Sequence, residues 1–163
     1  MTGRIARNGM MIALAFIFSY IEAIIPFHIG IPGVKLGIAN LVVVTALYLL
    51  GEKEAFYISI VRIVLVGFTF SNLFSMLYSI AGGMLSFGAM LLGKRMKKFS
   101  VIGVSVLGGF FHNVGQIVVA GFLVGTARII YYFPILAISG IGTGIIIGYL
   151  GKVIIERINR SVE

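Results

Sequence analysis

Six apolar runs, separated by short connections, dominate this sequence and limit what it can fold into. They cover about residues 9–27, 34–50, 54–70, 72–92, 100–124 and 130–151. A membrane-spanning helix needs roughly 20 predominantly apolar residues. The chain is 60% hydrophobic and only 11% charged, whereas soluble domains are about 25% charged. We therefore predict an all-α membrane protein, a six-transmembrane-helix bundle that forms one integral membrane domain over residues 1–163.

The basic residues fall mainly at the ends of these runs, which indicates the orientation of the chain. With six spans, one side receives Arg4, Arg7, Lys53, Lys94, Arg95, Lys97, Lys98, Lys152, Arg157 and Arg160. The other side receives Lys35 and Arg128, and Arg62 lies within a span. Loops rich in Lys and Arg stay in the cytoplasm. We therefore predict a multi-pass protein of the cell membrane with both termini cytoplasmic, and we interpret the net charge of +8 as a topology signal, not as a nucleic-acid footprint.

The residue types that are missing exclude several kinds of chemistry. The chain has no cysteine, so disulfides, thiolate metal sites and cysteine nucleophiles are ruled out. Aspartate is absent too, and the five acids are glutamates. The run Gly88–Lys94 fits G-x-x-x-x-G-K, but Arg95 follows where a phosphate-binding loop needs Ser or Thr for magnesium, and no strand precedes it. We expect no ATP binding by this chain itself, no metal and no cofactor.

Polar residues within the apolar runs are the candidates for a binding site. Glu22 falls in the first run and Arg62 near the middle of the third. His112 and Gln116 are four residues apart, so they share one helix face. Ionisable side chains in a bilayer cost roughly 2.5–3.5 kcal/mol each on insertion scales, so they face the interior of a bundle and usually have partners. They either line a substrate cavity or pair with one another, Arg62 with Glu22 and His112 with Gln116, only to hold the bundle together.

A cavity in the outer half of the bundle is the interpretation that we favour. Its predicted substrate-binding residues are Glu22, Lys35, Asn40, Arg62, Asn72, His112, Gln116 and Arg128, with Lys35 and Arg128 at the mouth. The cationic members suggest an anionic or strongly polar group on the substrate.

The connection between the first two runs is rich in residues that break helices. It contains Pro26, Pro32 and Gly33 together with His28 and Lys35. Proline cannot continue a helix interior, and the segment is apolar enough to fold back over a pocket. We predict a lid loop that includes His28, Pro32 and Gly33. A tight structural entry into the second helix, with Lys35 reaching to the membrane interface, is the alternative.

Small residues recur at the spacing that lets membrane helices approach closely. Gly140, Gly144 and Gly148 form one such ridge, and Gly121 and Gly125 form another. We expect internal packing at these ridges. Gly9, Ala13, Ala15 and Ser19 on the first helix are the candidates for docking to a second membrane protein.

Several segments resemble a known family. PGVKLGIANLVVVTALYLLG, SIVRIVL, GGMLSFGAMLL and GGFFHNVGQIVVA are similar to the Gx transporter family, also labelled heptaprenyl diphosphate synthase component I. That family in turn resembles the substrate-binding S components of energy-coupling factor (ECF) transporters. The resemblance implies a six-helix S-component-like bundle with an outward pocket under the loop after the first helix. It also implies partners: a transmembrane coupling subunit, docked through the first helix, and two cytoplasmic ATPases.

The synthase label can be tested against the composition. Prenyl chain elongation holds magnesium and diphosphate through aspartate-rich motifs, and magnesium prefers carboxylate oxygens. A chain without aspartate lacks those ligands, so we expect no enzyme activity. Three hypotheses remain: an S-component-like subunit that captures a small vitamin-like or isoprenoid- or quinone-related molecule from outside, a non-catalytic accessory subunit of an isoprenoid or quinone pathway, and a stand-alone secondary transporter. We favour the first.

Overall fold

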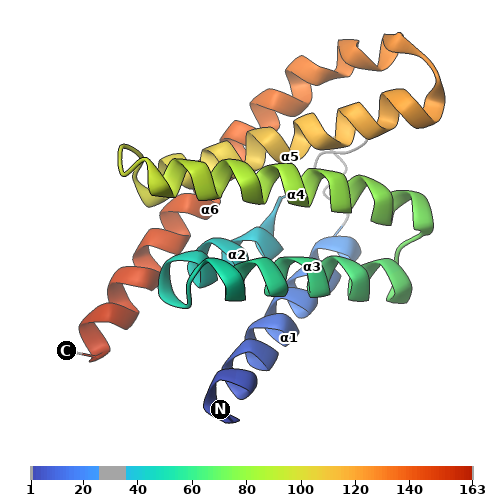
Figure 1. Cartoon of the computed structure of the whole chain (residues 1–163). Helices are drawn as coiled ribbons and strands as arrows, with labels where there is room; N and C mark the ends of the chain where they lie inside the picture. Colours follow the sequence, from blue (N-terminus) through green and yellow to red (C-terminus); the bar gives the residue numbers. More distant parts are fainter. Residues whose placement is uncertain (1, 26–35, 163) are drawn as a thin grey trace.

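The computed structural model describes residues 2–25 and 36–162. Within these ranges the chain forms six α-helices, one 3₁₀ helix and no strand (Figure 1). The elements are α1 (Thr2–Ile24), α2 (Ile38–Leu49), α3 (Glu52–Thr69), α4 (Leu73–Arg95), α5 (Val101–Val124), η1 (Ala127–Tyr132) and α6 (Phe133–Val162). The predicted all-α class and the number of helices are thus confirmed for the described residues. The predicted lid residues His28, Pro32 and Gly33, and also Lys35, lie outside those ranges.

The expectation of six full-length spans needs correction at α2 and α3. In the described part of the chain, four segments are long and apolar enough to cross a membrane: Gly3–Ile24, Leu73–Arg95, Val101–Val124 and Arg128–Ser161. α2 has 12 residues, which at ~1.5 Å per residue cover about 18 Å, less than the ~30 Å of bilayer hydrocarbon. α3 has 18 residues, but it carries Glu52, Lys53, Glu54 and Arg62.

Two other helices are longer than the apolar runs that predicted them. α1 begins at Thr2 instead of residue 9, and α6 continues to Val162 instead of ending at 151. Hydropathy marks only the apolar part of a helix, whereas backbone hydrogen bonding continues into the polar turns at each end. α2 is shorter than predicted because Gly37, in a left-handed conformation with φ of 70°, directly precedes it.

The helices form two groups, α1–α2–α3 and α4–α5–α6. In Figure 1 α4, α5 and the first part of α6 lie above α2 and α3, and the last part of α6 descends beside the lower group. In the second group α5 packs along both α4 and α6, and contacts of α3 with α4 and of α2 with α6 join the groups. α2 is buried on nearly all sides, with Val42, Val43, Val44, Ala46 and Leu47 in the core. A helix that is apolar all round requires such a central place.

Polar contacts connect the helix ends on one side of the bundle. We call this side the basic end because it carries most of the basic residues. Arg4 at the start of α1 pairs with Glu54 at the start of α3. Arg95 at the end of α4 pairs with Glu52, with Nη2 and Oε2 2.6 Å apart. The Lys94 ammonium donates to the carbonyl oxygen of Leu47 at the end of α2, at 2.6 Å. Successive helices alternate in direction, so the α2–α3 and α4–α5 connections meet there (Figure 1).

Glycines bring α5 and α6 into backbone contact, as the ridge in the sequence predicted. A methyl group placed on Gly144 would lie 2.7 Å from the Cα of Val106, and one on Gly148 would lie 2.7 Å from the Cα of Ile102. One on Gly140 would lie 2.7 Å from the carbonyl oxygen of Gly109. Internal packing of this ridge is therefore confirmed. The prediction of internal packing at Gly121 and Gly125 was wrong, because no described atom lies within 4 Å of a methyl group placed at either position. Gly125 instead ends α5 in a left-handed conformation with φ of 65°.

A substitution at the α5–α6 contact tests this packing. Gly148→Ala forces a methyl group against the backbone of α5, and overpacking of this kind costs about 1–3 kcal/mol. We expect a clearly lower thermal unfolding midpoint in detergent. Gly142→Ala is the matched control, because its methyl group meets no atom within 4 Å. Equal midpoints for the two variants would contradict backbone contact at Gly148.

Candidate functional site: a polar cavity between the two helix groups

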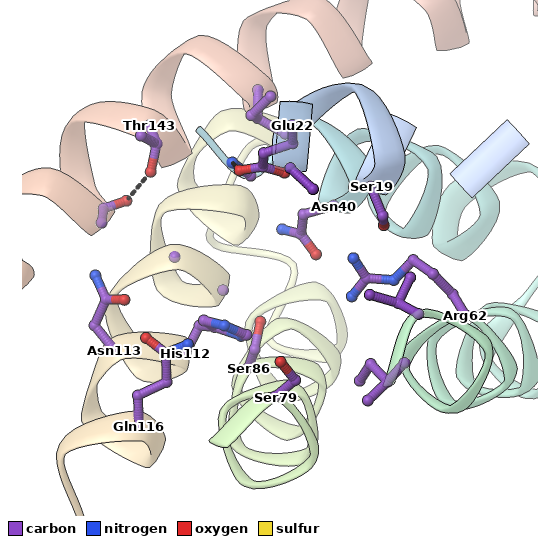
Figure 2. A pocket seen from close by; sticks show the side chains of 18 of the residues that line it. Ser19, Glu22, Asn40, Arg62, Ser79, Ser86, His112, Asn113, Gln116 and Thr143 are labelled. Carbon is purple, nitrogen blue, oxygen red and sulfur yellow. Dashed lines mark hydrogen bonds between the residues drawn. The ribbon is translucent and has the colours of Figure 1, made fainter. Parts of the chain in front are cut away.

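A cavity of about 210 Å³ lies between the two helix groups. Every α-helix contributes to its lining: α1 and α3 through their C-terminal halves, α2 and α6 through their N-terminal halves, and α4 and α5 through parts that reach the middle of each helix. Because the helices alternate in direction, the cavity extends from the middle of the bundle toward the end opposite the basic end. Figure 2 shows polar side chains from several helices around this space: Ser19, Glu22, Asn40, Arg62, Ser79, Ser86, His112, Asn113, Gln116 and Thr143.

Arg62 extends from α3 toward the cavity (Figure 2). Its Nε atom is buried and has no hydrogen-bond partner among the described residues. No ion pair joins Arg62 to Glu22 in the part of the chain that the structure describes, where the ion pairs are Arg4–Glu54, Arg95–Glu52 and Lys152–Glu156. A buried polar atom without a partner costs about 1–3 kcal/mol. Glu22 attracts the guanidinium through its charge, but the two side chains do not form the direct ion pair of the alternative.

Glu22 uses its carboxylate at the other side of the cavity. Its Oε1 atom accepts a hydrogen bond of 2.7 Å from the backbone N–H of Gly37. Gly37 directly precedes α2, where unpaired N–H groups and the helix dipole favour a negative charge. Glu22 thus fastens the end of α1 to the beginning of α2 and contributes an acidic edge to the cavity.

α5 supplies His112, Asn113 and Gln116 to the lining. A methyl group on Gly82 of α4 would lie 3.0 Å from the imidazole of His112 and 2.8 Å from its carbonyl oxygen. Glycine at position 82 therefore lets the His112 turn rest directly on α4. Asn113 is buried, and its Nδ2 donates to the carbonyl oxygen of Leu136 on α6 at 2.5 Å. Close packing on both sides fixes where this part of α5 meets the cavity.

Hydroxyl groups complete the lining, and two of them donate hydrogen bonds to the backbone of their own helix. Ser19 donates to the carbonyl oxygen of Ala15 at 2.9 Å, and Thr143 donates to that of Gly140 at 3.3 Å (Figure 2). Each hydroxyl oxygen still has lone pairs that can accept a further bond. Ser79 and Ser86 face the same space from α4. The cavity therefore offers one guanidinium, one carboxylate, the imidazole of His112 and a set of amide and hydroxyl donors and acceptors.

The structure places five of the eight predicted binding residues at one cavity. Glu22, Asn40, Arg62, His112 and Gln116 line it. Asn72 and Arg128 do not: Asn72 caps α4 by accepting a 2.8 Å bond from Ser75 N–H, and Arg128 is exposed on η1. Lys35 is outside the described ranges. Whether the five residues bind a ligand stays a prediction.

Sequence reasoning missed Ser79, Ser86 and Thr143 as lining residues. Serine and threonine in membrane helices commonly bond to their own backbone, so each alone carries little signal. A face of α4 that repeats Ser79, Gly82, Gly83 and Ser86 at spacings of three and four was the available sign, because it places small and hydroxyl residues in one stripe.

The predicted docking residues on α1 fall into two classes. Ala15 is completely buried, and Ser19 is buried at the cavity, so neither presents a surface to a partner. Gly9 and Ala13 are exposed, and a methyl group on Gly9 would meet no atom within 4 Å. This corrects the predicted docking face: α1 turns one stripe of small residues inward and leaves the other outside.

A metal centre finds no support at this site. In the described ranges, no three side chains of His, Cys, Asp or Glu lie together in a way that could hold a metal ion.

The comparison with known families identifies the chain at the family level. The model of the family described as heptaprenyl diphosphate synthase component I matches residues 11–154. The chain belongs to this family. The match covers all six helices except their outermost turns at the two ends of the chain, and it confirms the resemblance seen in the sequence. No curated protein and no solved structure matches the chain.

Removing the Glu22 carboxylate tests its role between α1 and α2. Glu22→Ala leaves the Gly37 N–H without its acceptor, which costs about 1–3 kcal/mol. We expect a lower thermal unfolding midpoint in detergent. Glu22→Gln keeps a carbonyl oxygen that can accept the same bond, so it should lose less. A midpoint for Glu22→Ala equal to that of the unchanged protein would show that the bond does not hold the two helices.

Proposed function

We propose that this chain is the substrate-binding membrane subunit, similar to an S component, of an ECF-type importer, and that it captures a small molecule from outside the cell. The observation that carries this proposal is the buried, unpartnered Nε of Arg62 beside a polar cavity. A buried cation is expensive in an apolar setting, and a site that only stabilised the bundle would pair it. A bound ligand would supply hydrogen-bond partners to the polar lining of the cavity.

The cavity and the basic end support the direction of transport. The basic end belongs on the cytoplasmic side by the rule for Lys and Arg, which places both termini there. The cavity extends from the middle of the bundle toward the opposite end, and in this proposal that end faces the outside. A ligand entering between α1, α3 and α4 would meet Arg62 and the hydroxyl groups of α4.

The exposed stripe of α1 is the surface that we assign to the coupling subunit. Gly9 and Ala13 leave space for another helix to approach, and close approach over small residues is how membrane helices associate. Cytoplasmic ATPases would supply the energy, because the chain's own G-x-x-x-x-G-K run ends α4 at Lys94 and Arg95, and its lysine bonds to Leu47 of α2.

The family description favours a second candidate. A component of a heptaprenyl diphosphate synthase would be a non-catalytic accessory subunit that organises an isoprenoid or quinone pathway at the membrane. The absence of aspartate in the sequence supports an accessory part over a catalytic one, because magnesium and diphosphate need several carboxylates.

Purification of the tagged chain from native membranes in mild detergent separates the two candidates. The importer predicts co-purification of a multi-pass coupling subunit with ATPases. The accessory subunit predicts soluble prenyl synthase subunits in their place. Recovery of the synthase subunits without ATPases would overturn the importer.

A substitution on the exposed stripe of α1 tests docking separately from folding. Ala13→Leu adds bulk at an exposed position, so we expect the yield of co-purified coupling subunit to fall about tenfold, since each 1.4 kcal/mol of lost binding is a factor of ten. Gly142→Leu on the exposed side of α6 is the matched control and should retain the partner. Equal recovery with both variants would remove Gly9 and Ala13 from the interface.

A further inference from the structure

The charge balance of the cavity limits the class of molecule that it can hold. Of the described residues in its lining, Arg62 is the one permanent cation and Glu22 the one acid. Glu22 already accepts the Gly37 N–H at 2.7 Å, and it forms no ion pair with Arg62 within the described ranges. The guanidinium therefore has no anion at hydrogen-bonding distance, while the carboxylate has a donor.

Apart from the imidazole of His112, the remaining lining consists of neutral polar groups and apolar groups. Amide and hydroxyl groups face the cavity from α2, α4, α5 and α6: Asn40, Ser79, Ser86, Asn113, Gln116 and Thr143. Asn113 and Thr143 each donate a hydrogen bond to a backbone carbonyl oxygen of α6, and their side-chain oxygen atoms can accept a hydrogen bond from a ligand. Apolar lining comes from Ile63, Val66, Phe70, Met76 and Ile147. This combination suits a compact body with a few hydrogen-bonding groups.

The volume sets an upper limit on size. Pockets for drug-sized molecules measure about 300–1,000 Å³, and this cavity measures about 210 Å³. On the side of α5 and α6 it has little room to expand, since a methyl group on Gly109 or Gly140 would already touch the backbone of the other helix. A compact molecule fits this space, whereas most of a long isoprenoid chain would lie outside it.

We propose that the ligand is a small oxyanion, a carboxylate or phosphate of compact size, whose charged group pairs with the Arg62 guanidinium while its body lies against α4 and α5. This inference rests on the proposed function in one respect, that the cavity is the ligand site. It favours an anionic ligand over cationic ligands, neutral ligands and long prenyl chains at that site. An arginine fork matches the two oxygens of a carboxylate or phosphate, and such an anion would give the Arg62 guanidinium a hydrogen-bonded partner in the cavity.

The test is to identify small molecules that stay bound during gentle purification, by mass spectrometry of the extracted protein. We compare the unchanged chain with Arg62→Gln, Arg62→Lys and Arg128→Gln. Arg128 is the matched control, because it is an exposed cation that does not line the cavity. A charged hydrogen bond contributes about 1.5–3 kcal/mol, so we expect the amount of anion retained by Arg62→Gln to fall at least about tenfold. Arg62→Lys should retain more anion than Arg62→Gln. Arg128→Gln should retain as much as the unchanged chain.

A second measurement does not depend on any variant. Sodium acetate and sodium phosphate are titrated against the unchanged chain at constant ionic strength with sodium chloride, and the thermal unfolding midpoint is followed. Stabilisation by acetate alone indicates a carboxylate ligand, and stabilisation by phosphate indicates a phosphate ligand. Either result, lost in Arg62→Gln, supports the proposal.

The contrary outcomes separate this inference from the proposed function. A neutral, cationic or long-chain molecule retained in the cavity would overturn the oxyanion and leave the substrate-binding subunit standing. An anion retained equally by Arg62→Gln would do the same. No retained molecule, together with no stabilisation by acetate or phosphate, would overturn the oxyanion, and the co-purification experiment would then decide the proposed function by itself.

Discussion

Backbone-to-backbone contact through glycine is the interaction on which the rest of this structure depends. In a bilayer the surrounding lipid is as apolar as leucine, so helices associate through close packing and not through the hydrophobic effect. α5 meets α6 at Gly109, Gly140, Gly144 and Gly148, and it meets α4 at Gly82 and Gly115. α5 is therefore fixed between α4 and α6, and there is no space for a larger side chain at these glycine positions.

That packing determines where the polar residues go. The close contact at Gly82 sets the His112 turn against α4, and the contact at Gly140 brings Asn113 within hydrogen-bonding distance of α6. The first helix group then closes the other side, with Glu22 fastened to Gly37 and Arg62 facing inward. Tight packing within α4–α5–α6 and looser packing between the groups leave the cavity between them, away from the basic end.

Much of the fold was readable in the sequence, because apolar runs and glycine spacing are local signals. α5 was predicted at 100–124 and observed at Val101–Val124, and the Gly140–Gly148 ridge packs as expected. The short α2 was not predicted, since hydropathy does not register the left-handed turn at Gly37. For the site, Glu22, Arg62 and His112 stood out as costly groups in apolar runs. The prediction that Asn72 lines the cavity was wrong, because an asparagine that caps a helix looks the same in sequence as one that binds a ligand. Ser79 and Ser86 were missed because the direction in which they face depends on how α4 is rotated in the bundle.

Access to the cavity from outside is the central claim, and cysteine labelling in intact cells tests it most directly. The chain has no cysteine, so Ser79→Cys introduces one thiol at the cavity and Ser105→Cys introduces one at a completely buried position between α5 and α6. With a membrane-impermeant maleimide, the account predicts labelling of Ser79→Cys from the outer face and none of Ser105→Cys, while both react after denaturation. Labelling of Ser79→Cys only from the cytoplasmic face, or no labelling of the folded chain from either face, would contradict an outward-facing ligand site.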